Sequence, residues 1–247
     1  MIIALAQSGL YYGNSGYFWG FDPTYMLILL ALVISGIFSA QMNTTFSKYS
    51  NVRAASGLTG AQAAQRILQS AGIYDVRIEQ VQGKLTDHYD PSNKVLRLSQ
   101  SVYGSNSIAA IGVAAHECGH AVQHARNYVP LNIRSAIVPL ANFGSQLSWP
   151  LFFIGLIASM KPLLMAGILL FCGALLFQIV TLPVEINASK RALVMLGDTG
   201  ILGETEVKST RKVLRAAAMT YVAAVIGSLL QLLRLLVLSG AFRRRDD

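Results

Sequence analysis

A His-Glu-x-x-His motif at residues 116–120 holds the side chains whose types and spacing are best suited to chemistry. It lies in an apolar run, 108–122, that is long enough for a helix. Because residues four apart share one face of a helix, His116 and His120 can offer two imidazoles to one metal ion. Glu117 follows the first imidazole and can accept a proton from a water held by that ion. These roles indicate zinc-assisted hydrolysis.

The alternative interpretation of this motif is a helix with two histidines on an ordinary polar face. The flanking side chains oppose it because they are apolar, namely Ile111, Val113, Ala114, Ala115, Ala121 and Val122. Two histidines and a glutamate are costly to bury in such a helix unless a metal or other partners compensate. The sequence therefore favours a metal site, with Cys118 as a small apolar filler of the same helix.

His124 extends the four-residue spacing of the motif and is one candidate for a third metal ligand. Catalytic zinc is usually held by three protein groups and one water. On a continuous helix, His124 lies about 9 Å along the axis from the midpoint of His116 and His120, at about 1.5 Å per residue. That distance is too long for sharing one ion, so we expect His124 near the surface at the end of the helix.

Glu185 is the favoured third ligand among the few acidic residues that follow the motif. It ends an apolar run, and the small residues Ala188 and Ser189 would let its helix pack close to the motif helix. The need of a catalytic zinc for a third donor supports this interpretation. The alternative is an interfacial glutamate that pairs with Lys190 or Arg191.

The composition is that of a membrane protein. Hydrophobic residues make up 53% of the 247 residues and charged residues 13%, about half the usual charged share. The mean hydropathy is +0.47. The net charge of +8 is typical of loops that face anionic lipid. Basic and aromatic residues do not interleave as single-strand binding requires, so we expect no nucleic-acid partner. The two cysteines, Cys118 and Cys172, do not indicate a disulfide framework.

Apolar runs and polar segments alternate along the chain and predict seven parts. These are an extracytoplasmic segment (1–23), a first transmembrane helix (24–42), a catalytic segment with the motif (43–136), a transmembrane hairpin (137–183), a second catalytic segment with the third ligand (184–215), a transmembrane or membrane-associated helix (216–238) and a basic tail (239–247). Membrane lipid is therefore an expected partner. A tight turn at Lys161-Pro162 should separate the two helices of the hairpin.

Within the first catalytic segment, local signals predict helices and strands. Thr59 and Gln62 form a capping-box pattern that starts a helix, and the motif helix should begin near Ser107. Strand-like runs at 76–81, 85–89 and 95–99 are separated by turn residues. They predict a three-stranded antiparallel meander.

The distribution of basic residues predicts the orientation in the membrane. The two catalytic segments carry most of the Lys and Arg residues, which the positive-inside rule places in the cytoplasm, with the N-terminus outside. If 216–238 spans the membrane, the arginines at 243–245 end outside and violate that rule, so a spanning and a non-spanning helix both stay open. Arg234, within that run, must reach the interface or face a protein interior.

Four blocks of sequence resemble a known family. They are Gly-Lys-Leu-Thr-Asp-His-Tyr-Asp-Pro at 83–91, Ala-Ala-His-Glu-Cys-Gly-His-Ala-Val-Gln at 114–123, Thr-Leu-Pro-Val-Glu-Ile-Asn-Ala-Ser-Lys-Arg-Ala at 181–192 and Ala-Ala-Ala-Met-Thr-Tyr-Val-Ala-Ala at 216–224. The chain thereby resembles the YugP-like neutral zinc metallopeptidases of bacteria, and more distantly the HtpX-type and prenyl-protein membrane peptidases. The resemblance extends from about residue 22 to residue 238.

This resemblance implies an α-helical membrane protein with a small zincin-like α+β metallopeptidase domain, built from the meander and the motif helix. It implies a gluzincin site, with Zn²⁺ on His116, His120 and Glu185 and with Glu117 as the base. HtpX-type enzymes carry an acidic residue four positions after the ligand glutamate. Here that position is Ser189, so Asn187 or Ser189 is the candidate for orienting a ligand.

The sequence therefore predicts a multi-pass zinc metalloendopeptidase of the bacterial inner membrane, with its site at the cytoplasmic surface. We expect its substrates to be membrane proteins or membrane-associated peptides. A strand of the meander would bind an extended substrate. His88 is a candidate donor to the oxyanion, although the turn chemistry of 87–91 favours a role in the turn. The alternatives are a non-catalytic zinc-containing scaffold or adaptor and a zinc transporter or sensor. A homo-oligomer and a membrane-protein partner both stay open.

Overall fold

The computed structural model describes residues 22–83 and 85–240. Two compact units divide the chain: the described parts of 1–37, 137–178 and 223–247 form the first, and those of 38–136 and 179–222 form the second. The expected N-terminal segment and basic tail lie mostly outside the described residues, so their roles stay predictions.

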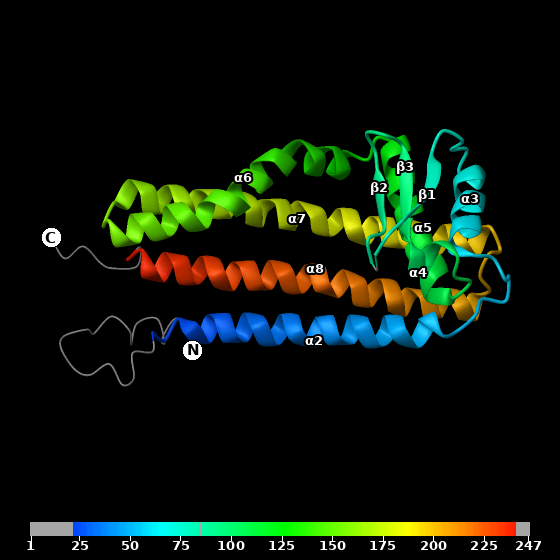
Figure 1. The fold of residues 1–247 in the computed structure, drawn as a ribbon, viewed down its shortest axis with the longest axis horizontal. Helices are drawn as coiled ribbons and strands as arrows, with labels where there is room; N and C mark the ends of the chain where they lie inside the picture. Colours follow the sequence, from blue (N-terminus) through cyan, green and yellow to red (C-terminus); the bar gives the residue numbers. More distant parts are fainter. Residues whose placement is uncertain (1–21, 84, 241–247) are drawn as a thin grey trace. The chain divides into compact units, whose positions relative to one another are not determined.

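Four helices are long and apolar enough to cross a membrane. They are α2 (Tyr25–Ser50), α6 (Val129–Ile157), α7 (Lys161–Asp198) and α8 (Glu204–Leu238) (Figure 1). Each helix contributes one part to each unit. Helix α7 continues through Pro183 to Asp198, so the part of the chain around Glu185 is helical.

The turn between α6 and α7 lies at residues 158–160, before the expected Lys161-Pro162. Ser159 adopts a left-handed conformation there, with φ of 55°. Pro162 is the second residue of α7. A proline fits that position because the first turn of a helix has no main-chain partner for its N–H groups.

Arg234, in the first unit, contacts two residues at the start of α2. Its Nε donates to the Thr24 hydroxyl at 3.2 Å, and its guanidinium lies 4.9 Å from the centre of the Tyr25 ring. Arg234 therefore faces protein groups at the start of α2. Nearby in the same unit, Phe152 and Leu235 are among the buried residues of a small apolar cluster.

The second unit contains a three-stranded mixed sheet, and the prediction of an antiparallel meander is wrong. Strand β1 (Arg77–Val81) pairs in parallel with β3 (Val95–Ser99), and β2 (His88–Asp90) pairs with β3 in antiparallel orientation. The spatial order is β1-β3-β2. The chain does reverse direction twice, but the third strand lies in the centre.

Burial explains this order. Four of the five residues of β3 are buried, whereas β1 and β2 are half-buried or exposed. A strand rich in valine and leucine gains most from the central position, while polar strands are suited to the edges. The connection from β1 to β2 also departs from a two-residue hairpin turn, because it extends over residues 82–87 and both strands pair with β3.

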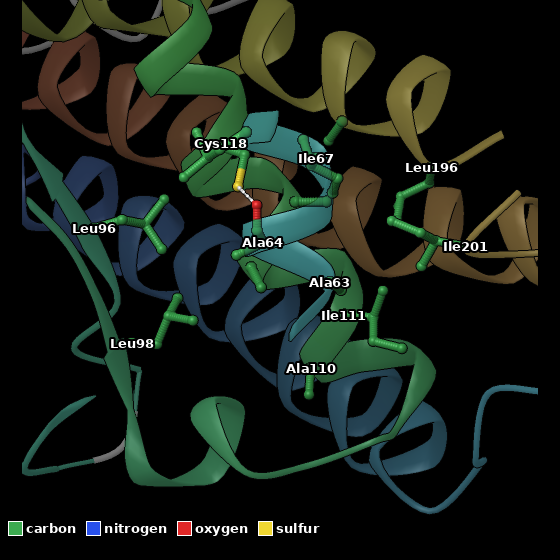
Figure 2. Close-up of a cluster of buried hydrophobic side chains, with 14 of the residues drawn as sticks. Ala63, Ala64, Ile67, Leu96, Leu98, Ala110, Ile111, Cys118, Leu196 and Ile201 are labelled. Carbon is green, nitrogen blue, oxygen red and sulfur yellow. Dashed lines mark hydrogen bonds between the residues drawn. The ribbon is translucent and has the colours of Figure 1, made fainter. Parts of the chain in front are cut away.

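Helices α3 (Gly60–Ser70), α4 (Gln100–Tyr103) and α5 (Ile108–Ala125) complete the second unit. The Thr59–Gln62 capping box and the Ser107 cap of α5 are both present, as predicted. Figure 2 shows the core of this unit, whose labelled members include Ile67, Leu96, Leu98, Ile111, Cys118, Leu196 and Ile201. The core fixes α5 between α3 and the ends of the long helices, and α5 carries the His-Glu-x-x-His motif.

Candidate metal centre

Helix α5 places the motif side chains on adjacent turns. The Ser107 hydroxyl accepts a hydrogen bond from the Ala110 N–H at 3.2 Å and starts the helix. Because the helix is continuous through the motif, the rings of His116 and His120 lie one above the other, with centroids 4.8 Å apart. The imidazole pair expected from the sequence spacing is therefore formed.

Glu185, on α7, reaches both imidazoles. Its Oε2 lies 3.2 Å from His116 Nε2 and 3.6 Å from His120 Nε2. The Glu185 side chain is only 5% exposed. Among the described residues, the ion pairs of Glu185 are with these two histidines and not with Lys190 or Arg191. The Arg191 Nε donates to the Asn187 side chain instead, at 2.7 Å. Two residues far apart in sequence from Glu185 thus share its carboxylate.

These three side chains fit a zinc ion. One ligand atom from each lies within 4.8 Å of the others. Tetrahedral ligands at about 2.0–2.1 Å from zinc are separated by roughly 3.3 Å. The two nitrogen–oxygen distances, 3.2 and 3.6 Å, bracket that separation. Two imidazoles and one carboxylate are also a donor set that catalytic zinc sites use.

Small residues allow the two helices to approach each other here. Ala188 and Ala192 of α7 are fully buried, and Gly119 of α5 faces the main chain of Ala188. The prediction that small residues after Glu185 permit close packing is therefore confirmed. The contribution of Gly119 was not foreseen, although a glycine inside a helical motif is a recognisable signal of close backbone approach.

Each imidazole also has a polar partner on its other nitrogen. His116 Nδ1 lies 3.1 Å from the Ser189 hydroxyl, and His120 Nδ1 lies 3.0 Å from Gln123 Oε1. Ser189 was one of the two expected orienting residues, and Asn187 contacts Gln123 rather than a histidine. Gln123 was missed, although it lies three residues after His120, on the same helical face.

The electrostatic environment of the site favours a cation. Burial acts to lower the pKa of His120, but the Glu185 carboxylate, 3.6 Å from its Nε2, and the negative charge of Glu117 outweigh burial and raise that pKa. A site that stabilises a positive charge on a buried imidazole also stabilises a bound metal ion.

A cleft opens beside these residues. It is lined by Val113, His116 and Glu117 of α5, Glu185 and Ser189 of α7, Leu214, Ala217, Ala218 and Tyr221 of α8, and Leu85 and Asp87 of the loop before β2. Asp87 is held in place because it accepts hydrogen bonds from the Ser99 N–H at 2.7 Å and from its hydroxyl at 3.0 Å. Tyr221 was missed by sequence reasoning, although a tyrosine in the apolar run 216–238 was a visible signal.

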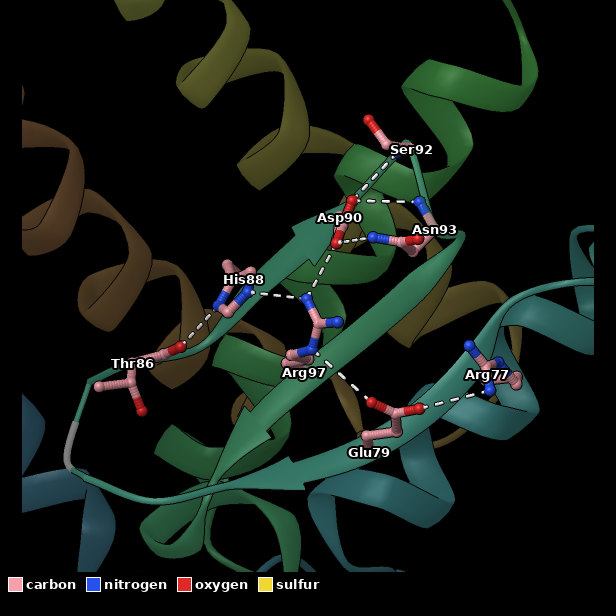
Figure 3. Close-up of polar contacts among 8 residues, drawn as sticks. All are labelled: Arg77, Glu79, Thr86, His88, Asp90, Ser92, Asn93 and Arg97. Carbon is pink, nitrogen blue, oxygen red and sulfur yellow. Dashed lines mark hydrogen bonds and ion pairs between the residues drawn. The ribbon is translucent and has the colours of Figure 1, made fainter. Parts of the chain in front are cut away.

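The remaining histidines serve elsewhere. His88 Nδ1 donates to the Thr86 carbonyl at 2.8 Å, and its Nε2 lies 3.4 Å from Arg97 Nη1 (Figure 3). His124 Nδ1 lies 2.9 Å from the Tyr89 hydroxyl. Neither histidine is among the described residues that line the cleft. The structure therefore agrees with the turn role expected for His88.

Cys118 is fully buried and free, as is expected of an apolar filler. Its thiol donates a hydrogen bond to the Ala64 carbonyl at 3.7 Å (Figure 2). Burial raises the pKa of this thiol far above its ordinary value, which disfavours the thiolate that would bind a metal.

Comparison with known proteins identifies relatives along most of the chain. The sequence model of a family described as "Putative neutral zinc metallopeptidase" matches residues 24–240. The chain is also 47% identical, over 212 residues, to the protein named "Putative membrane protease YugP" from Bacillus subtilis (strain 168). That alignment covers 86% of this chain and 94% of the relative. No solved structure matches the chain.

Proposed function

The chain belongs to the neutral zinc metallopeptidase family, and on that premise we propose that it is a membrane-embedded zinc endopeptidase. In this proposal His116, His120 and Glu185 hold the zinc ion, and Glu117 is the general base. The observation that carries it is the convergence of one ligand atom from each of the three residues within 4.8 Å.

The proposed mechanism is hydrolysis of a peptide bond by water. When bound, zinc supplies Lewis acidity that lowers the pKa of a coordinated water toward about 7 and polarises a carbonyl. Glu117 lines the cleft beside His116 and Glu185, where it takes a proton from the attacking water. As the water oxygen bonds to the carbonyl carbon and the C–N bond breaks, Glu117 passes that proton to the amine nitrogen.

The negative charge that develops on the carbonyl oxygen needs a hydrogen-bond donor to stabilise it. Tyr221 is the candidate for this role because it lines the same cleft as Glu117 and Glu185. A neutral phenol in a preorganised position can donate to an oxyanion. His88 is less suitable, because Thr86 and Arg97 already engage both of its ring nitrogens.

A substrate in extended conformation suits this cleft. Strand β2 lies at the edge of the sheet, and the segment just before it contributes Leu85 and Asp87 to the cleft. An exposed edge strand can pair with the main chain of an extended peptide. The main-chain pairing would bind many sequences, and the cleft would select among their side chains.

We further propose that substrates are membrane proteins or membrane-associated peptides, cleaved near the cytoplasmic surface of the bacterial inner membrane. Glu185 and Tyr221 both lie on helices long and apolar enough to span a membrane. Basic residues of the second unit, such as Lys48, Lys190 and Arg191, support the cytoplasmic orientation by the positive-inside rule. Equal cleavage of a soluble casein-like substrate in detergent and in bilayers would contradict this proposal.

A scaffold with a structural zinc is the less favoured alternative. Structural zinc sites are closed by four protein ligands, whereas the metal-ligand group found among the described residues has three members. Three ligands leave a position for water, which is what hydrolysis requires.

The direct test compares zinc content and peptide hydrolysis in the purified full-length protein and in Glu117→Gln. We expect the variant to retain zinc and to lose about 10²–10⁴-fold in activity, because it lacks the general base. Glu204→Gln, an equal change on an exposed side chain, is the control and should retain full activity. Full activity of Glu117→Gln would remove Glu117 from the mechanism.

A further inference from the structure

The side-chain amide of Gln123 lies between His120 and helix α7 and is fully buried. Its Nε2 donates to the Val184 carbonyl at 2.9 Å and to Asn187 Oδ1 at 3.0 Å. Its Oε1 lies 3.0 Å from His120 Nδ1. The amide therefore makes three hydrogen bonds, and all of them join it to α5 and α7, the two helices that carry the candidate metal ligands.

The partners of Gln123 determine which way its amide points. A guanidinium has only donors, so the Asn187 atom that meets Arg191 Nε at 2.7 Å must be the amide oxygen. The main-chain carbonyl of Val184 can only accept. Both groups on this side of Gln123 are thus acceptors, and only its NH₂ group can satisfy them. The Gln123 oxygen must then face His120.

The direction of this chain of hydrogen bonds also fixes the proton on His120. An amide oxygen can only accept, so the Nδ1 atom of His120 must carry the hydrogen that it donates. In the neutral ring the lone pair is then on Nε2, the atom that lies 3.6 Å from the Glu185 carboxylate. A lone pair and a carboxylate repel each other unless a cation lies between them.

We propose that Gln123, oriented by Asn187 and Arg191, is a positioning residue that holds His120 in the tautomer able to bind the metal. The inference deepens the proposed function and rests on the metal site assigned there. His116 differs, because its partner is the Ser189 hydroxyl, which can either donate or accept. His120 is therefore the ligand that the fold orients before any metal arrives.

The first experiment locates the proton on His120 in the full-length protein in detergent micelles. Nitrogen NMR of ¹⁵N-labelled histidine is recorded without metal at increasing pH until the spectrum shows His120 as a neutral ring, because Glu185 and Glu117 raise its pKa above the ordinary value of about 6.5. We expect the His120 proton on Nδ1. A proton on Nε2 would overturn the proposal. If the proton is on Nδ1 but the wild-type protein binds no zinc, the positioning role stands and the proposed function fails.

The second experiment measures zinc affinity by competition with a chromophoric chelator. Gln123→Met keeps the length of the side chain but removes its acceptor and donors, so we expect binding about 10–100-fold weaker and a mixture of His120 tautomers. Asn187→Leu should shift both measurements in the same direction. Asn187→Asp keeps an acceptor for both Gln123 and Arg191 and should restore the wild-type tautomer and affinity.

A matched control separates the loss of a buried glutamine from the loss of this hydrogen-bond chain. Gln231→Met changes a glutamine in the first unit whose Nε2 is also buried, and it should leave zinc affinity unchanged. Circular dichroism establishes that each variant is folded. The proposal is overturned if folded Gln123→Met binds zinc as tightly as the wild type and retains the proton on Nδ1.

Discussion

Gly119 of α5 and Ala188 of α7 approach so closely that a Cβ at position 119 would lie 2.5 Å from the Ala188 carbonyl oxygen. This approach sets the position of both ligand-bearing helices. Glu185 precedes Ala188 by three residues, and Ser189 follows it directly, so both side chains are directed by the same stretch of α7. The absence of a side chain at position 119 therefore brings the carboxylate within reach of the two imidazoles.

The first prediction concerns Gly119→Ala. The added methyl group meets main-chain atoms, which cannot rotate away, so α5 and α7 must separate. We expect a loss of about 1–3 kcal/mol in the free energy of unfolding, as for other overpacked sites, and weaker zinc binding because Glu185 moves away from His116 and His120. Thermal unfolding and chelator competition measure the two effects.

Gly197→Ala is the control for this substitution. Gly197 also lies in α7, but no heavy atom lies within 4 Å of a Cβ built there. Alanine favours a helix over glycine by up to about 1 kcal/mol, so this variant should be as stable as the wild type or more stable, with the same zinc affinity. Equal zinc affinity in both alanine variants would show that the Gly119–Ala188 approach does not position the site.

The second prediction concerns Tyr221, whose side chain shares the cleft with Glu117. If its phenol stabilises the oxyanion, Tyr221→Phe should lose about 10²–10³-fold in kcat, the usual effect of removing one such donor. Zinc content at saturating zinc should not change, because the variant keeps all three proposed ligands. Tyr74→Phe, at a side chain that is 80% exposed, should retain wild-type activity. A wild-type kcat in Tyr221→Phe would mean that another group stabilises the oxyanion.

The sequence alone was sufficient to predict the part of the site that depends on the geometry of one helix or on the size of residues. The spacing of His116 and His120 is a local property, because a four-residue interval means one face of any helix. The choice of Glu185 rested on the need of the motif for a third donor and on small neighbours that permit close packing, and its carboxylate does meet both imidazoles.

The features that sequence reasoning missed depend on how separate helices are aligned. Gln123 reaches Val184 and Asn187 only because of the relative register of α5 and α7. Tyr221 enters the cleft only because α8 packs beside them. For the sheet, turn residues gave the correct reversals of direction, but local signals could not show that β3 would lie between β1 and β2. That order follows from burial in the complete core.

The third prediction concerns the reactivity of Cys118. Burial raises the pKa of its thiol, and alkylating reagents attack the thiolate. We therefore expect no labelling of Cys118 in the folded protein at neutral pH and rapid labelling after denaturation, as measured by mass spectrometry of peptides that contain residue 118. Rapid labelling before denaturation would mean that the core around α3 and α5 opens readily.

The last prediction concerns acid stability and the polar cluster on the sheet. Asp90 accepts hydrogen bonds from the Asn93 side chain at 2.9 Å, from Arg97 Nη1 at 3.0 Å and from the Ser92 N–H at 3.0 Å (Figure 3). The side chains of Asn93 and Arg97 hold the pKa of Asp90 well below its usual value. A carboxyl whose pKa is lowered by folding stabilises the protein above its unfolded pKa of about 3.9. That contribution is lost as the pH falls through the lower, folded pKa.

We therefore expect Asp90→Asn to lower the Tm at neutral pH, and the difference from the wild type to narrow as the pH falls below about 4. Asp198→Asn removes the same charge from an exposed position at the end of α7 and should not lower the Tm. Thermal unfolding at a series of pH values, followed by circular dichroism, makes the comparison. A Tm difference that stays constant down to the lowest pH would mean that the charge of the Asp90 carboxylate is not what stabilises the fold.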